Sequence, residues 1–288
     1  MFNLRCVWPL AAKLGEGPVW ANGALWFVDI KCHHIHRFDP ATGATQSWNA
    51  PDQVTFVLPR ADGAYIVGLT GKLARFEPES GKFETLCTLE PSYPGNRTND
   101  ACIDANGKLW FGTMDDRCRL PNGSLYSWSG AGAPVLHDGG YVISNGPAFS
   151  PAGRTFYHTD TVRRTVHRFD VASDGSLSGK RDFVKIEEEA GVPDGSVVDA
   201  EGCVWVALYG GWGVRRYSPE GALLKTVAFP CANVTKIAFG GPGLKTAFAT
   251  TAAQDISPEK ALKQPLAGGL FAFDVEVPGI APASMASA

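Results

Sequence analysis

Four short polar segments carry acid and amide side chains beside glycines or at the start of apolar strands. Glu16 lies between two glycines, Asn99 and Asp100 precede an apolar strand, and Asn145 and Asp194 are each followed by glycine. All five side chains offer oxygen atoms, which hard or borderline divalent cations prefer. Taken singly, each residue is better explained as part of an ordinary solvated or Asx-capped turn.

The spacing of these residues relative to a repeated phrase indicates one shared site. Glu16 lies seven residues before Gly23, and Asn99, Asn145 and Asp194 each lie eight residues before the glycine of their own repeat. Equivalent positions in different units of a ring point at one another around its axis. Acid and amide groups gathered in this way repel one another and are poorly solvated without a cation. The sequence therefore predicts a divalent metal ion in a central channel.

The repeated phrase is a turn followed by a strand of alternating aromatic and aliphatic residues. Its six copies start at residues 23, 63, 107, 153, 202 and 244, which are 40, 44, 46, 49 and 42 residues apart. A period in the forties with several short strands per unit is typical of propeller blades. A second strand and a Pro- or Gly-containing turn follow each phrase, which gives about four strands per unit. The predicted fold is an all-β, six-bladed propeller.

We expect a single propeller domain over residues 1–288. The N-terminal segment 5–9 is spare in the repeat count, and we expect it to complete the last blade, closing the ring and removing an exposed sheet edge. The segment 280–288 is low in complexity and is predicted to be frayed. In such a ring the innermost strands line the channel, so chemistry is expected on loops that converge at one end of it.

Composition argues against several other classes of protein. Apolar residues make up 44% and charged residues 19% of the 288 positions, and 33 Gly and 20 Pro fit many turns. A formal net charge of -3 gives no case for nucleic acid, and no apolar run approaches the ~20 residues of a membrane span. The seven cysteines are scattered without a Cys-x-x-Cys pair, unlike a zinc–thiolate site. With no secretory signal pattern, we expect a cytoplasmic protein with reduced thiols, monomeric or weakly dimeric.

Together the segments resemble the SMP-30/gluconolactonase/luciferin-regenerating family, and within it the bacterial sugar lactonases that include xylonolactonase and arabinolactonase. The resemblance spans almost the whole chain, and its motifs are specific only in combination. The matching segments, in the family's order, are Leu14–Trp20 (LGEGPVW), Arg97–Asp100 (RTND), Leu109–Met114 (LWFGTM), Ser144–Pro147 (SNGP), Phe156–Thr161 (FYHTDT), Pro193–Gly195 (PDG), Val204–Leu208 (VWVAL) and Phe239–Pro242 (FGGP).

The resemblance implies a six-bladed propeller with one catalytic divalent ion. Carried over by motif, the metal ligands are Glu16, Asn145 and Asp194. Asn99 is expected to contact the ion through water or to hold the substrate, and Arg97 to hydrogen-bond sugar hydroxyls or the ring carboxyl function. Calcium, zinc, manganese and ferrous iron all occur in the family, and this ligand set does not choose among them.

The activity implied is hydrolysis of a sugar lactone, a carboxylic ester, to the aldonic acid; candidates are xylono-, arabino-, galactono- and gluconolactone. The ion would polarise the lactone carbonyl, and Asp194 would activate water as general base. Asp115 or Asp116 is expected to bind hydroxyls, and Trp212 to form an aromatic wall on a glycine-rich rim loop. Lys236 stands where many relatives carry Ser, and would narrow the pocket or contact the substrate.

Two other functions stay open from the sequence. A phosphotriesterase-like hydrolase on a similar metal propeller would place the same oxygen ligands on the axis, although Arg97 and the polar rim favour a hydroxylated substrate. A propeller that serves as a protein-binding platform would not need converging acids and amides. Serine-hydrolase chemistry is unsupported, because no serine lies in a Gly-x-Ser-x-Gly elbow.

Overall fold

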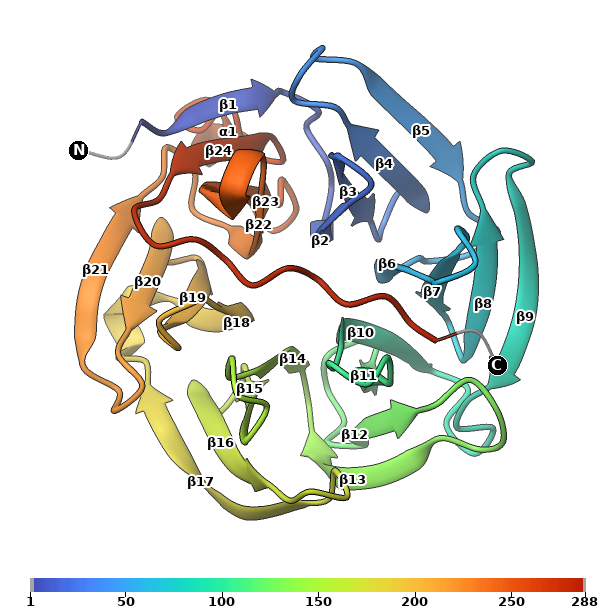
Figure 1. The fold of residues 1–288 in the computed structure, drawn as a ribbon. Helices are drawn as coiled ribbons and strands as arrows, with labels where there is room; N and C mark the ends of the chain where they lie inside the picture. Colours follow the sequence, from blue (N-terminus) through green and yellow to red (C-terminus); the bar gives the residue numbers. More distant parts are fainter. Residues whose placement is uncertain (1–2, 287–288) are drawn as a thin grey trace.

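The strands form six four-stranded antiparallel sheets arranged as blades around a ring (Figure 1). The structure, a computed structural model, describes residues 3–286. Within five of the blades the strands follow one another in chain order from the channel outward, as the labels in Figure 1 show. The predicted all-β, six-bladed propeller is confirmed.

The strands are short, and the helical segments are confined to connections. The first three blades contain β2 (Gly15–Ala21), β3 (Ala24–Asp29), β4 (His34–Phe38), β5 (Thr45–Asn49); β6 (Phe56–Pro59), β7 (Tyr65–Leu69), β8 (Lys72–Glu77), β9 (Lys82–Thr88); and β10 (Asn96–Ile103), β11 (Leu109–Asp115), β12 (Gly123–Trp128), β13 (Val135–Tyr141). The next two contain β14 (Ser144–Phe149), β15 (Thr155–Asp160), β16 (Thr165–Val171), β17 (Leu177–Lys185); and β18 (Val192–Val198), β19 (Val204–Tyr209), β20 (Gly213–Tyr217), β21 (Leu223–Ala228). The helical segments are η1 (Glu188–Ala190), η2 (Pro242–Leu244) and α1 (Pro258–Ala261). In the described part of the chain, no helix has the length and hydrophobicity needed to cross a membrane.

The sixth blade is made from both ends of the described chain. It contains β22 (Val234–Gly240), β23 (Thr246–Thr251), β24 (Leu270–Asp274) and, as its outermost strand, β1 (Arg5–Trp8). β1 pairs antiparallel with β24, with Arg5 opposite Ala272 and Cys6 opposite Phe271. The backbone groups along the outer side of β24 are therefore hydrogen-bonded to the N-terminal strand.

Apolar packing between neighbouring blades forms the core. The repeated sequence phrases are the second strands of the blades, and β3, β7 and β11 are buried along their whole length. Large rings meet between adjacent blades, for example Trp26 with Tyr65 at 4.3 Å and Trp110 with Phe156 at 5.2 Å between centroids. Burial of such large apolar surfaces is the main favourable contribution to folding and makes the ring a firm support for its inner strands.

Five of the six innermost strands are bulged at a similar place. The pairing register shifts in β2 between Glu16 and Val19, in β10 between Thr98 and Ala101, in β14 between Asn145 and Ala148, in β18 between Pro193 and Ser196, and in β22 between Val234 and Lys236. The sixth, β6, pairs regularly along its length and is apolar. A β-bulge bends its strand and redirects the neighbouring side chains. The polar segments singled out in the sequence coincide with these bulges.

The segment after β24 crosses the ring from the sixth blade to the opposite side, as the red trace in Figure 1 shows. Near its start, the Pro278 carbonyl accepts a hydrogen bond from the Ala200 amide at 2.9 Å. Near its end, the Met285 amide donates to the Pro59 carbonyl at 2.8 Å, and the Met285 carbonyl accepts from Ala61 at 2.9 Å. The segment therefore joins blades that lie on different sides of the channel.

This path differs from the frayed tail predicted over 280–288, of which residues 287–288 lie outside the described part. The physical reason is that Met285 is fully buried among apolar side chains of the first three blades, including Leu58 and Leu109. Backbone hydrogen bonds on both sides of the channel then hold the intervening residues. A composition of Ala, Ser and Pro reveals neither feature, because the order depends on a single apolar anchor.

Candidate metal centre

Glu16, Asn145 and Asp194 lie at the bulges of β2, β14 and β18, the innermost strands of three different blades. The glycine after Glu16 and the glycine after Asn145 have left-handed backbones, with φ of 53° at Gly17 and 54° at Gly146. A Cβ at Gly146 would lie 2.8 Å from the amide nitrogen of the adjoining blade's inner strand. Glycine is therefore required there both by conformation and by space, and the bulged geometry sets the direction of the ligand side chain.

A chain of side-chain hydrogen bonds fixes the amides. Arg97 Nη1 donates to Asn99 Oδ1 at 2.5 Å, and Asn99 Nδ2 donates to Asn145 Oδ1 at 2.7 Å. Asn145 Nδ2 donates in turn to Thr161 Oγ1 at 3.1 Å. Because the arginine cannot accept a hydrogen bond, the chain defines which atom of each amide is oxygen. The Asn145 oxygen is held on the side of Asn99 and keeps a second lone pair for another partner.

The two carboxylates of the predicted ligand set are buried with little support. Glu16 and Asp194 are each 6% exposed. Glu16 Oε2 accepts a hydrogen bond from the amide of Gly17 at 2.8 Å. Within residues 3–286 the Asp194 carboxylate accepts no hydrogen bond. An ionised carboxylate in such a place is strongly disfavoured unless it is paired with a cation.

The carboxylates of Glu16, Asp194 and Asp100 interact electrostatically. Burial, followed by the negative charge of Asp100, raises the pKa of Glu16 to about 8. Burial, followed by the charges of Glu16 and Asp100, raises the pKa of Asp194 well above its usual range. The positive charges of Lys236 and Arg97 act in the opposite direction on both groups. The carboxylates thus share one environment that disfavours a concentration of negative charge.

The donor set fits a hard or borderline divalent cation. Glu16, Asp194 and the amide oxygen of Asn145 would supply three oxygen ligands from three blades, which is the chemistry that such ions prefer. Residues 3–286 contain no metal-site cluster of three or more His, Cys, Asp or Glu side chains. A metal site built from Glu16 and Asp194 would therefore need an amide oxygen, such as that of Asn145, as its third protein ligand.

Asp100 and Lys236 form a buried ion pair beneath this set. Asp100 is 3% and Lys236 6% exposed. Lys236 Nζ donates to Asp100 Oδ1 and also, at 3.4 Å, to the Ala101 carbonyl. Asp100 Oδ2 accepts from the Gly146 amide at 3.0 Å. The sequence predicted that Lys236 narrows the pocket or contacts the substrate; in the structure its ammonium is bonded to protein oxygens, and its role toward the substrate stays a prediction.

A second charged cluster surrounds Arg97 at the rim. Arg97 Nε donates to Asp116 Oδ1 at 2.8 Å, and Lys31 Nζ donates to the same oxygen at 2.7 Å. Gln53 Nε2 donates to Asp116 Oδ2 at 3.1 Å. Burial would raise the pKa of Asp116, but the hydrogen bond from Lys31 and the charge of Arg97 outweigh it and lower the pKa to about 2. Asp116 is therefore ionised at neutral pH and positions the Arg97 guanidinium.

The other two predicted rim residues lie at the same end of the blades but are engaged differently. Asp115 pairs with Asn96 at the start of β10, and its carboxylate accepts hydrogen bonds from the amides of Arg119 and Leu120, at 3.0 and 3.2 Å. This carboxylate therefore stabilises the loop that directly follows Asp115. Trp212 lies in the turn between β19 and β20, is 45% exposed, and donates its amide to the Ala232 carbonyl. Its side chain is free to form part of an exposed rim.

Sequence reasoning missed three residues of this network: Lys31, Gln53 and Thr161. Lys31 and Thr161 lie just after β3 and β15, the strands that pair with the bulged strands β2 and β14. In an antiparallel hairpin the end of the second strand returns to the start of the first. Polar residues directly after the repeated phrases were therefore a usable signal. Gln53 lies in the connection between the first two blades and carries no such signal.

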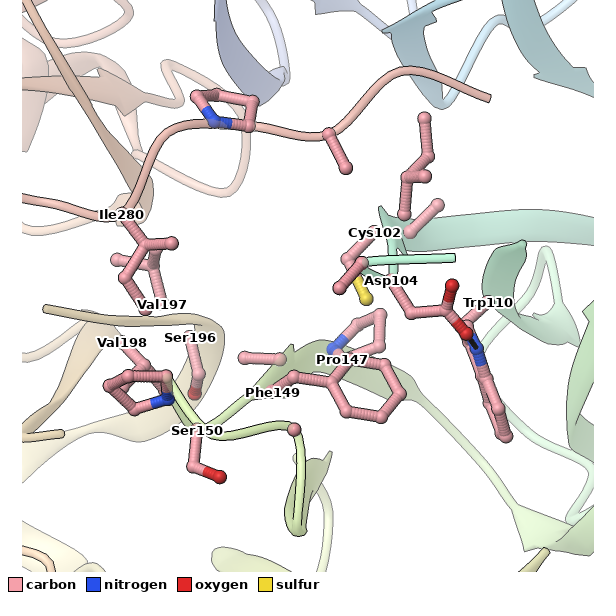
Figure 2. Close-up of a pocket in the computed structure, with 18 of the residues that line it drawn as sticks. Cys102, Asp104, Trp110, Pro147, Phe149, Ser150, Ser196, Val197, Val198 and Ile280 are labelled. Carbon is pink, nitrogen blue, oxygen red and sulfur yellow. Dashed lines mark hydrogen bonds between the residues drawn. The ribbon is translucent and has the colours of Figure 1, made fainter. Parts of the chain in front are cut away.

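A cavity lies at the other end of the channel. It has a volume of about 750 Å³ and is lined by the second halves of inner strands and by residues 280–283 of the crossing segment. Figure 2 shows Phe149, Val197 and Ile280 around this space, with Asp104 on the facing side. Of the described residues that line it, none belongs to the predicted ligand set, whereas Lys236 does line it. The ion pair of Lys236 thus stands between the candidate metal centre and an apolar chamber.

The fold is a six-bladed propeller, and its inner strands bring acid and amide oxygens of several blades into the channel. This combination identifies the class of protein to which the chain is compared. The family model described as SMP-30/Gluconolactonase/LRE-like region matches residues 14–253. The chain belongs to this family.

Relatives match the chain along nearly its whole length. Regucalcin of Xenopus laevis is 32% identical over 294 residues, covering 99% of this chain and 98% of the relative. A 6-deoxy-6-sulfogluconolactonase of Pseudomonas putida is 32% identical over 284 residues, covering 97% of each. The crystal structure of a calcium-binding protein, regucalcin, from Agrobacterium tumefaciens has a TM-score of 0.94 at 27% identity, covering 99% of this chain and 97% of that one.

Proposed function

We propose that the protein hydrolyses an aldonolactone to the open-chain aldonic acid, using one divalent ion held by Glu16, Asn145 and Asp194. The observation that carries this proposal is the buried Asp194 carboxylate, which accepts no hydrogen bond from the described residues. The negative charge of Glu16 further raises the pKa of Asp194. Such a group requires a proton or a cation. The family and its sulfogluconolactonase member support a sugar lactone as the substrate class.

In the proposed reaction Asp194 transfers the proton, and the bound ion activates the carbonyl and the water. When bound, the ion would polarise the lactone carbonyl and make water more acidic. Asp194 takes a proton from the attacking water as the new C–O bond forms, and gives it to the ring oxygen as the ring C–O bond breaks. No net proton is gained or lost by the enzyme in forming the acid, and the product carboxylic acid then ionises in solvent.

Arg97 and Asn99 orient the substrate. Arg97 Nε is held by Asp116 and Nη1 by Asn99, so the guanidinium has a fixed plane. Its Nη2 makes no hydrogen bond with residues 3–286 and is available to a sugar hydroxyl. Asn99 donates to the Asn145 oxygen and so steadies a ligand atom. Precise positioning of this kind lowers the barrier without contributing to the bond changes.

The proposal includes the identity of the substrate and of the ion, the cellular location and the oligomeric state. Xylono-, arabino-, galactono- and gluconolactone are the candidate substrates, and Ca²⁺, Zn²⁺, Mn²⁺ and Fe²⁺ the candidate ions; the calcium-binding relative supports a divalent ion. All seven cysteines are free, which supports a reducing and hence cytoplasmic location. We take the partner to be the small-molecule substrate and the protein to be a monomer or weak dimer.

The test is hydrolysis of the lactone panel by chelator-treated protein resupplied with each ion in turn. Asp194→Asn is expected to lower kcat by at least about a hundredfold at saturating ion, because it removes the proton acceptor. Asp170→Asn, the same change at an exposed ion pair with Arg181, is the matched control. Activity of the Asp194 variant within about threefold of the parent would remove Asp194 from the base role. Hydrolysis of a phosphotriester without hydrolysis of any lactone would favour the phosphotriesterase-like alternative.

A further inference from the structure

Lys236 reaches across the channel between opposite blades. It lies on β22 in the sixth blade, and its partner Asp100 lies on β10 in the third, which face each other across the ring (Figure 1). Both side chains are buried. A hydrogen-bonded ion pair in this position spans the channel just below the candidate metal centre.

The pair also contacts the backbone beside two of the proposed ligands. A Cβ at Gly195, next to Asp194, would lie 2.5 Å from Cβ and Cγ of Lys236, so the lysine stem runs directly over that glycine. Asp100 Oδ2 accepts the amide hydrogen of Gly146, next to Asn145. The two halves of the pair thus support two ligand-bearing bulges from below.

Charge counting shows what the lysine contributes. Three buried carboxylates, Glu16, Asp100 and Asp194, act on one another in the centre of the channel. Arg97 and Lys31 are both bonded to Asp116, and neither is bonded to any of these three carboxylates. Lys236 is bonded to Asp100, so Glu16 and Asp194 are the two carboxylates of the three without a bonded cation in residues 3–286, and their charge is that which one divalent ion neutralises. A neutral residue at this position would leave three.

We propose that Lys236 is a built-in cation that withholds Asp100 from the metal ion, keeps the metal-free site folded and limits the affinity for divalent ions. The proposal rests on the metal site of the proposed function. It assigns Lys236 no contact with the substrate. Removing one partner of a buried ion pair leaves an uncompensated charge, which destabilises the fold, while an added negative charge close to the site attracts the dication more strongly.

The experiment uses Lys236→Met, which keeps the length of the stem and removes the charge, in the full chain. Dissociation constants for Ca²⁺, Mn²⁺ and Zn²⁺ are measured by titration calorimetry, and melting temperatures in chelator and in excess ion. We expect about tenfold or more tighter ion binding and, in chelator, a melting temperature lower by at least about 5 °C. Saturating ion should recover most of that loss. Lys82→Met, at an exposed position on an outer strand, makes the same change in net charge and should alter neither quantity.

Asp100→Asn/Lys236→Met tests the same idea where the single variant does not fold without metal. It replaces the ion pair by a neutral pair and keeps the net charge, so its ion affinity should return to within about threefold of the parent. Parental ion affinity in Lys236→Met, or an affinity in the double variant as tight as in a folded single variant, would overturn the proposal. If the parent binds none of the ions, the proposed metal-dependent function fails; if the parent binds and the charge-altered variants do not differ, only the role of Lys236 fails.

Discussion

The two ends of the channel have opposite effects on the stability of the fold. At one end, Glu16 and Asp194 are buried carboxylates with almost no protein donors. At the other end, mainly apolar side chains line a chamber of about 750 Å³ that the segment 280–283 helps to enclose. The first arrangement opposes folding unless an ion is present, whereas the second favours folding by burying Met285 and by satisfying backbone groups. Function and stability are thus separated along one axis, with the Lys236–Asp100 pair between them.

The separation has a simple structural origin. Inner strands begin with a bulge that carries polar residues and continue as regular strands with apolar residues. Bulges redirect side chains at the first end, and regular pairing presents apolar side chains at the second. Each strand therefore contributes to both ends, and substitutions at the two ends should have separable effects.

The largest effect is expected from Asp194→Asn. Loss of the proton acceptor should lower lactonase activity by about 10²-fold or more, while loss of a buried, mutually repelled carboxylate should raise the melting temperature of the metal-free protein. Activity on the lactone panel and thermal unfolding in chelator measure the two quantities. A lower melting temperature in chelator would mean that the metal end contributes to stability, and would contradict the separation of function and stability between the two ends.

Met285→Ala should affect the other end alone. Met285 is fully buried and anchors the crossing segment to the first three blades. We expect the free energy of unfolding to fall by about 2–5 kcal/mol, with kcat and ion affinity unchanged well below the melting temperature. Denaturant unfolding and lactone assays test this, with Ser284→Ala at an exposed neighbouring position as the control. A parallel loss of ion affinity would show that the two ends are coupled.

Acid should act on the supports of the metal end. His158 is fully buried, is hydrogen-bonded through Nε2 to Ser144 beside a proposed ligand, and burial lowers its pKa to about 3. Because the folded pKa lies below the unfolded value of about 6.5, this contribution to stability is complete above pH 6.5 and is lost as pH falls toward 3.

His158→Leu should therefore show a shallower fall in the free energy of unfolding between pH 6.5 and 4, by up to about 1.4 kcal/mol per pH unit. Met285→Ala, which removes no titratable group, should keep the slope of the parent. Denaturant unfolding at several pH values measures both. Identical slopes in the parent and the His158 variant would remove this histidine as the acid-sensitive support.

The sequence predicted the features that repeat and missed those that do not. Six phrases repeated every 40 to 49 residues predicted the blades, and a spacing of seven or eight residues predicted equivalent positions for Glu16, Asn145 and Asp194, which lie at equivalent bulges. Their hydrogen bonds and mutual charges agree with a common environment. Their role as metal ligands stays a prediction that the ion-binding experiments test.

Three features of the structure have a common physical cause that the sequence does not show. The partner of Lys236 lies 136 residues away, the anchor of the tail is a single methionine, and Asp115 and Asp116 differ in role although they are neighbours. Asp115 caps its own loop, while Asp116 reaches Lys31 and Arg97. Each outcome depends on which distant group the ring brings close, and neither composition nor spacing carries that information.

The smallest effect is expected from Asp116→Asn. Asp116 holds the Arg97 guanidinium, and its pKa of about 2, set against burial by the hydrogen bond from Lys31 and the charge of Arg97, shows that the charged form is favoured. The variant leaves Arg97 in place but less firmly oriented, so KM for the lactone should rise about tenfold with kcat within about threefold of the parent. Steady-state kinetics with saturating ion tests this, with Asp170→Asn as the control. A fall in kcat with unchanged KM would instead place Asp116 in the chemical step and extend the reactive part of the metal end to its rim.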